Sequence, residues 1–144
     1  MTTLVCFLEE TSARVFLEGV FSRLLPDGNS VKYVVFEGKQ DLEKQIVRKL
    51  RRWQEPDSVF LVMRDQDTAI CTTVKANLAR LCNEAQKPTC IPDNIVNPSK
   101  ELEKITGGIY QKIGGSREIG KVISLTCNSS HSFNALISGI QRLF

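Results

Sequence analysis

The chain has 144 residues, 42% of them hydrophobic and 24% charged, which is typical of one globular domain with its own core. Its 19 lysines and arginines exceed its 16 aspartates and glutamates, and the net charge of +3 permits a nucleic-acid partner without requiring one. No apolar stretch approaches the ~20 residues that cross a bilayer, and the N-terminus lacks the basic region of a signal peptide. We therefore expect a cytoplasmic protein without a membrane partner.

The first half of the chain alternates short apolar runs with stretches of helical period. In chain order the predictions are a strand over 4–8, a helix over 12–25, a strand over 31–36, a helix over 40–53, a strand over 58–64 and a helix over 69–86. The predicted inward faces of these helices carry Val15, Phe16, Val20 and Leu24, then Leu42, Ile46, Leu50 and Trp53, then Ile70, Val74, Leu78, Leu81 and Cys82. Such alternation predicts an α/β fold with a mainly parallel sheet of about four strands flanked by helices.

The second half is less regular. Residues 88–98 hold three of the five prolines and are interpreted as a connector. Short helices are predicted over 100–106, ended by Gly107-Gly108, and over 116–123. A terminal helix is predicted over 132–144, with one apolar face made of Phe133, Leu136, Ile137, Ile140 and Phe144. We expect a single domain over 1–144, with a βαβαβα core over 1–90 and the connector and C-terminal helices over 91–144.

The five cysteines are Cys6, Cys71, Cys82, Cys90 and Cys127, and none forms a CxxC pair. A zinc site needs closer ligand spacing, and an odd number of cysteines in a cytosolic chain argues against a disulfide framework. We expect Cys6 and Cys82 to act as small core hydrophobes.

Acidic residues follow each of the three predicted strands. Glu9 comes after the first strand, and Asp65 and Asp67 come after the third. Because right-handed crossovers bring the carboxyl ends of parallel strands to one edge, Glu9, Glu37 and Asp65 should share that edge. Asp65 and Asp67 should project to the same side of an extended segment. Such a carboxylate cluster holds magnesium and serves phosphoryl chemistry, although acidic groups also stabilise helix N-termini and Asp67 could simply cap a helix.

Three other motifs leave alternatives open. Residues 115–121 match the pattern GxxxxGK, but Val122 replaces the Ser or Thr of a phosphate-binding loop, so we interpret the match as accidental. His131 is the only histidine, and it is either a group titrating near neutrality or the neighbour of a helix cap at Ser130 or Ser132. A basic cluster is either a solvated helix face or a phosphate-contacting surface with Trp53 for base stacking. It comprises Lys44, Arg48, Lys49, Arg51 and Arg52.

Five stretches together suggest a family: residues 7–13, 35–42, 61–67, 106–112 and 130–133. They resemble the Toprim domain of topoisomerases, primases, recombination-mediator proteins and OLD nucleases. They are more closely similar to a bacterial Toprim-like group described as domain of unknown function number four-two-seven-six.

The resemblance implies a single Toprim-like domain in which Glu9, Asp65 and Asp67 bind Mg²⁺ or Mn²⁺ and serve cleavage of DNA or RNA. Glu10 and His131 are further candidates for the catalytic set. Lys39 and Arg64 are candidate phosphate contacts, with Arg48, Arg51 and Arg52 of the basic cluster as further nucleic-acid contacts. The resemblance also implies an ABC-type or AAA-type ATPase partner in a bacterial anti-phage defence system. The partner would dock on the terminal helix or on the helix over 40–53.

The chain departs from this group after the expected fourth strand. Members carry there a segment with an Arg-Glu-Leu-Glu-like motif, whereas here Cys90-Ile91 runs directly into Pro92-Asp93-Asn94. Either the protein lacks that segment or the segment is missing from this sequence. A true loss would favour an alternative function as a non-catalytic subunit that binds a protein partner or nucleic acid. A primase-like nucleotidyl transferase is a weaker alternative. Topoisomerase activity is disfavoured because Tyr33 and Tyr110 lie in a strand and a loop without evident activation.

Overall fold

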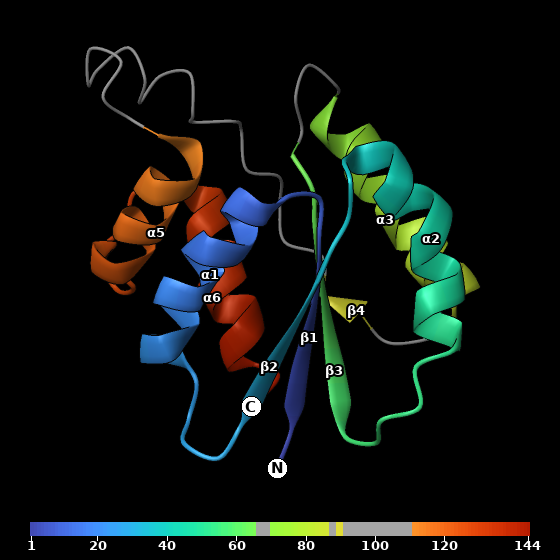
Figure 1. The fold of residues 1–144 in the computed structure, drawn as a ribbon, viewed down its shortest axis with the longest axis horizontal. Helices are drawn as coiled ribbons and strands as arrows, with labels where there is room; N and C mark the ends of the chain where they lie inside the picture. The colour runs from blue at the N-terminus through green and yellow to red at the C-terminus, as the bar shows by residue number, and fades with distance from the viewer. Residues whose placement is uncertain (66–69, 87–88, 91–110) are drawn as a thin grey trace.

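The computed structural model describes residues 1–65, 70–86, 89–90 and 111–144 (Figure 1). The elements are β1 (Thr3–Leu8), α1 (Thr11–Leu24), β2 (Ser30–Val35), α2 (Lys39–Arg51), β3 (Ser58–Met63), α3 (Cys71–Glu84), β4 (Thr89–Cys90), α5 (Lys112–Val122) and α6 (His131–Gln141). Residues 89–90 of the predicted connector over 88–98 instead form β4, because they pair with β3. The rest of that connector, the helix predicted over 100–106 and the junction between Ile91 and Pro92 lie outside the described residues. No helix in the described part of the chain is long and apolar enough to cross a membrane.

The strands form one sheet in the order β2-β1-β3-β4, and every pairing is parallel. This confirms the predicted α/β class and the parallel sheet. The fourth strand is short, because β4 has only two residues, which pair with Phe60 and Leu61 of β3. β1 lies between two strands and between two helical layers, so all six of its residues are buried.

Helices cover both faces of the sheet. α2 and α3 pack on one side, α1 and α6 pack on the other, and α5 packs against α1 (Figure 1). Side chains of β1 alternate between the two faces of the sheet. Val5 and Phe7 point to the side covered by α2 and α3. Leu4, Cys6 and Leu8 point to the side covered by α1 and α6. The phenyl ring of Phe7 lies 6.0 Å from that of Phe36 and 6.1 Å from that of Phe60, between ring centroids.

α5 lies unusually close to α1. A Cβ atom on Gly120 would overlap the carbonyl oxygen of Phe16, and one on Gly19 would lie 2.5 Å from the carbonyl carbon of Gly120. The guanidinium of Arg23 donates hydrogen bonds of 2.8 and 2.9 Å to the carbonyl oxygens of Gly120 and Ile123, at the end of α5. The two glycines and this arginine therefore hold α5 firmly against α1.

The GxxxxGK pattern lies inside α5. In a helix, N–H groups bond to carbonyl groups four residues earlier, so they cannot wrap around a phosphate as a P-loop does. The structure thus supports the interpretation of this match as accidental. Gly120 is explained by the close contact between α1 and α5.

Helix ends account for the errors in the predicted elements. The helix predicted over 116–123 begins four residues earlier, at Lys112. Ile70 was predicted to face inward but is 71% exposed, because it precedes the first turn of α3 in an extended conformation. Phe144 was predicted on the apolar face of the last helix but is 38% exposed, because α6 ends at Gln141 and the chain leaves the helical path there.

Candidate active site

The carboxyl ends of β1, β2 and β3 form one edge of the sheet. Leu8 is in register with Val35 on one side and with Met63 on the other. The pairing continues beyond the strands, because the N–H of Phe36 donates to the carbonyl of Leu8 at 2.9 Å and the N–H of Gly38 donates to that of Glu9 at 3.2 Å. The shared edge predicted from the crossover rule is therefore confirmed.

Glu9 and Asp65 meet at this edge. The Oε2 atom of Glu9 accepts a hydrogen bond of 2.9 Å from the main-chain N–H of Asp65. Both residues are half-buried. A carboxylate has roughly four lone-pair sites, so this bond orients the Glu9 side chain without preventing it from coordinating a cation.

The third predicted ligand, Asp67, lies outside the described residues. Within residues 1–65, 70–86, 89–90 and 111–144, no group of three or more His, Cys, Asp or Glu side chains is placed to hold a metal ion. The structure therefore brings two of the three predicted ligands, Glu9 and Asp65, into contact through the main chain of Asp65.

Glu10 takes part in an ion pair beside Glu9. Its Oε1 atom accepts the hydroxyl of Ser12 at 2.5 Å, and its Oε2 atom accepts the ammonium of Lys112 at 2.5 Å. Lys112 is the first residue of α5. Partial burial lowers the pKa of Lys112, but the hydrogen bond and charge of Glu10, with the charges of Asp65 and Glu9, more than offset it and leave the pKa above its ordinary value. The ammonium thus lies in the combined field of three carboxylates.

Arg64 connects this edge to α2 and α3. Its guanidinium forms an ion pair with Glu43 of α2, and only 7% of the Arg64 side chain is exposed. The same carboxylate oxygen of Glu43 accepts a hydrogen bond of 3.2 Å from Asn77 of α3. The Nε atom of Arg64 also donates to the carbonyl of Asp65 at 3.3 Å. These contacts favour a positioning role for Arg64 over the predicted phosphate contact.

The other residues predicted to bind nucleic acid lie on α2 or directly after it. Lys39 begins the helix, directly after Gly38 at the edge, and is exposed. Arg48 and Arg51 follow 9 and 12 positions later, which is about 13 and 18 Å along a helix. α2 runs back toward the opposite edge of the sheet (Figure 1). The structure therefore places Lys39 near Glu9 and separates Arg48, Arg51 and Arg52 from it.

Contacts within the protein account for several members of that cluster. Arg51 donates to the carbonyl of Glu84, the last residue of α3, at 2.9 Å. Arg48 donates to the side chain of Gln45 at 3.2 Å, and Arg52 is exposed beyond the end of α2. The ring of Trp53 packs edge-on against core aromatic rings, and its indole N–H donates to the Ser58 hydroxyl at 3.0 Å. Trp53 is thus half-buried and packs against the core, which favours a structural role over base stacking.

His131 begins α6 and is exposed. The Oγ atom of Ser130 accepts the N–H of Phe133 at 3.3 Å, so Ser130 is the N-cap of this helix. The predicted serine cap beside His131 is thus confirmed, and the catalytic role of His131 stays a prediction.

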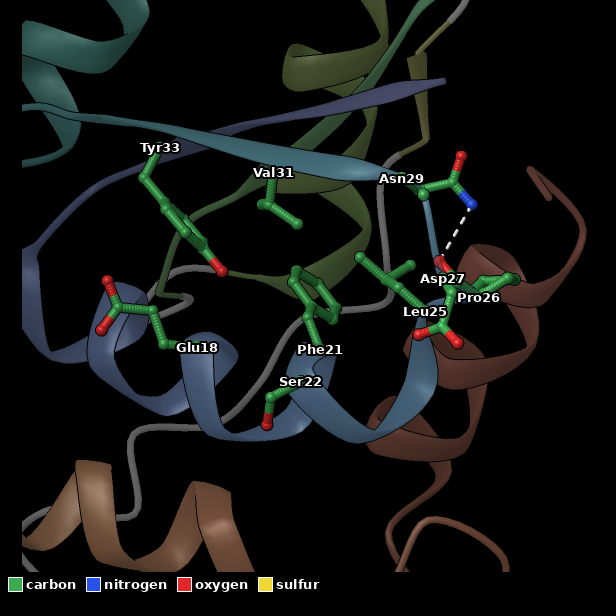
Figure 2. Close-up of a pocket in the computed structure, with 10 residues that line it drawn as sticks. Glu18, Phe21, Ser22, Leu25, Pro26, Asp27, Asn29, Val31 and Tyr33 are labelled. Atoms are coloured by element: carbon green, nitrogen blue, oxygen red, sulfur yellow. Dashed lines mark hydrogen bonds between the residues drawn. The ribbon is translucent and has the colours of Figure 1, made fainter. Parts of the chain in front are cut away.

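A pocket of about 340 Å³ lies away from this edge, between the second half of α1 and β2 (Figure 2). Glu18 and Phe21 from α1 and Val31 and Tyr33 from β2 contribute to its lining. Burial, with the nearby Cys6 and Glu18, raises the pKa of Tyr33 far above its ordinary value. A neutral, half-buried phenol is a poor nucleophile, in agreement with the expectation that Tyr33 is not catalytic. Tyr110 lies outside the described residues.

Sequence-based reasoning missed two residues of the edge, Lys112 and Glu43. Lys112 belongs to the stretch 106–112 that supports the family resemblance. Its place in that stretch is the one signal that could have identified it as a site residue. Glu43 lies on the charged face of an amphipathic helix, where nothing in the sequence distinguishes it from its neighbours.

Comparisons of the chain with models of protein families, with curated proteins and with solved structures found no match. The parallel sheet flanked by helices is compatible with a Toprim-like domain. The family resemblance itself stays a prediction, which depends on the five stretches quoted above.

Proposed function

We propose that this protein is a magnesium-dependent, Toprim-type nuclease that cleaves phosphodiester bonds of nucleic acids. The observation that carries the proposal is the contact between the Glu9 carboxylate and the Asp65 main chain at the carboxyl edge of the sheet. Ligands and substrates of α/β proteins bind at this edge. Two of the three acidic residues that the motif requires are adjacent there.

The available donor atoms fit a hard divalent cation. Carboxylate oxygens are the ligands that Mg²⁺ and Mn²⁺ prefer. Glu9, Asp65 and Asp67 would hold the ion, which supplies positive charge at the phosphate and lowers the pKa of a bound water. The N–H of Asp65 fixes the direction of the Glu9 carboxylate, so Glu9 is oriented before any ligand enters. In this arrangement Glu9 serves as a ligand or as a general acid or base.

An ATPase partner belongs to the same proposal and is supported by the family resemblance alone. Of the two predicted docking surfaces, the exposed basic face of α2 is the better candidate. The apolar residues of α6 are already buried against the sheet, as shown by Phe133, Leu136, Ile137 and Ile140. Contact with an ATPase of an anti-phage system would then control the nuclease.

One structural observation favours the alternative function of a non-catalytic subunit. The ammonium of Lys112 places a positive charge beside Glu9 and Asp65. In a site that has lost metal binding, such a charge would stabilise the remaining carboxylates. A true loss of the Arg-Glu-Leu-Glu-like segment that the family resemblance implies after Cys90 would point the same way.

A cleavage assay distinguishes the two functions. Plasmid DNA and transfer RNA are incubated with Mn²⁺ or with EDTA, using the wild type, Asp65→Asn and Glu9→Gln. Asp27→Asn is the matched control, because Asp27 is exposed in the turn after α1, far from the edge. We expect Mn²⁺-dependent cleavage by the wild type and the control. Substitution of a residue that only orients a metal ligand lowers activity by up to ~100-fold. Substitution of the ligands themselves, in Asp65→Asn and Glu9→Gln, should lower it by at least that much. Absence of cleavage by the wild type, or equal cleavage by all four proteins, would contradict the nuclease function.

A further inference from the structure

The ion pair between Glu10 and Lys112 lies at the proposed active edge, although it connects residues 102 positions apart. About 45% of the Lys112 side chain and 32% of the Glu10 side chain are exposed. Pairs with this much exposure add little to stability. A stabilising role therefore does not explain why the fold brings this lysine to the edge.

The position of the Lys112 ammonium is set by contacts on both sides. The ammonium of Lys112 donates a hydrogen bond of 2.5 Å to Oε2 of Glu10. The hydroxyl of Ser12 donates one of 2.5 Å to the other oxygen, Oε1 of Glu10. On the other side, α5 is fixed to α1 by the contact of Gly19 with Gly120 and by the hydrogen bonds of Arg23. Lys112 is also at the N-terminal end of α5, where the helix dipole adds positive potential.

Arg64 cannot serve as the phosphate-binding cation of this edge in the same way. Its guanidinium is almost wholly enclosed and is paired with Glu43. Lys112 is much more accessible and lies close enough to Glu9 and Asp65 to feel their charges. An ammonium is a compact point charge with three donors, which suits contact with a phosphate oxygen.

We propose that Lys112 is a phosphate-binding residue of this site, held in position by Glu10, and that it contacts the nucleic-acid backbone next to the acidic cluster. This role rests on the nuclease function proposed above. When a phosphate enters, the ammonium keeps its bond to Glu10 and donates another to a phosphate oxygen. Glu10 is then a positioning residue rather than a general acid or base.

The test measures how the binding of nucleic acid depends on salt. A short fluorescent DNA duplex and a single-stranded RNA of equal length are titrated with protein in Ca²⁺, at several KCl concentrations. Each phosphate contact contributes about 0.9 to the slope of log K against log salt for duplex DNA, and about 0.7 for single strands. We expect Lys112→Gln to reduce the magnitude of the slope by about the contribution of one phosphate contact. Lys112→Arg should preserve the slope.

Lys121→Gln is the matched control, because Lys121 is on the same helix and also pairs with a glutamate, Glu118. Lys121 is nine positions from Lys112, or about 13 Å along the helix. The Lys121→Gln variant should therefore leave the slope unchanged. Glu10→Gln should weaken binding less than Lys112→Gln does, because it releases the ammonium but retains its charge.

The outcomes separate this inference from the proposed function. If the wild type binds and cleaves nucleic acid while Lys112→Gln has the wild-type slope, Lys112 is not a phosphate contact and the nuclease function still stands. If Lys121→Gln lowers the slope as much as Lys112→Gln does, the effect is general and the assignment of Lys112 is wrong. If the wild type binds neither probe, both proposals fail.

Discussion

The side chain of Glu9 accepts a hydrogen bond from the main chain of Asp65, although the two residues are 56 positions apart. The contact ties the end of β1 to the end of the neighbouring strand β3. Because the donor is a main-chain N–H, the contact does not depend on the aspartate side chain. Replacing Asp65 with Asn therefore removes a charge from the edge while leaving the Glu9 contact in place.

The same contact predicts how substitutions at Glu9 affect stability. Glu9→Ala leaves the N–H of half-buried Asp65 without this acceptor, which should cost about 1–3 kcal/mol. Glu9→Gln keeps an oxygen of similar position and should cost less than about 1 kcal/mol. Urea unfolding of both variants measures the difference. Equal destabilisation by Ala and Gln would show that the charge, not the hydrogen bond, holds this contact.

The ion pair between Glu43 and Arg64 should contribute more to stability than the surface pairs do. Glu43→Ala leaves the enclosed guanidinium of Arg64 without its counter-ion, and we expect a loss of about 3 kcal/mol. Glu18→Ala is the control, because its pair with Arg14 is exposed and should be worth less than about 1 kcal/mol. The free energy of unfolding in urea tests both values. Similar losses in the two variants would contradict the positioning role of Arg64.

Two glycines of α5 should respond in opposite ways to alanine. In Gly120→Ala the new methyl group overlaps the carbonyl oxygen of Phe16, so we expect a loss of about 1–3 kcal/mol or more. In Gly114→Ala the nearest atom is 3.9 Å from the new Cβ, and the better helix propensity should add up to about 1 kcal/mol. Thermal unfolding distinguishes them. A Gly120→Ala protein as stable as the wild type would show that α1 and α5 are not in close contact.

Burial predicts which thiols react. Cys6 is fully buried, and burial raises the pKa of its thiol far above the ordinary value, so at pH 8 it has almost no thiolate. Cys127 is exposed. Brief treatment of the native protein with iodoacetamide, followed by peptide mass spectrometry, should modify Cys127 and leave Cys6 and Cys82 unmodified. Rapid labelling of Cys6 would contradict the central position of β1.

Much of the fold was predictable because its signals are local. The apolar runs of β1, β2 and β3 and the period of α1, α2 and α3 are visible within short windows of sequence, and their alternation fixes a parallel sheet. The shared edge of Glu9 and Asp65 then follows from the crossover rule. The helix ends were less predictable, as Ile70 and Lys112 show, because capping and tertiary contacts determine where a helix begins.

The site was only partly predictable, because its remaining contacts are long-range. Lys112 reaches Glu10 only since Gly120 lets α5 approach α1, and no local pattern encodes that approach. The separation of Arg48 and Arg51 from the edge, by contrast, was derivable from the topology. A helix that follows a strand in a parallel sheet runs back toward the opposite edge, so the end of α2 lies away from Glu9.

The most direct test of the central claim, that Glu9 and Asp65 belong to a divalent-metal site, is calorimetric titration of the purified protein with Mn²⁺. Wild type and Asp65→Asn are compared at equal concentration, with Asp27→Asn as the control for loss of one negative charge. We predict saturable binding by the wild type and the control, and an affinity at least ~10-fold lower for Asp65→Asn. Equal binding by all three proteins, or no binding by the wild type, would contradict the account.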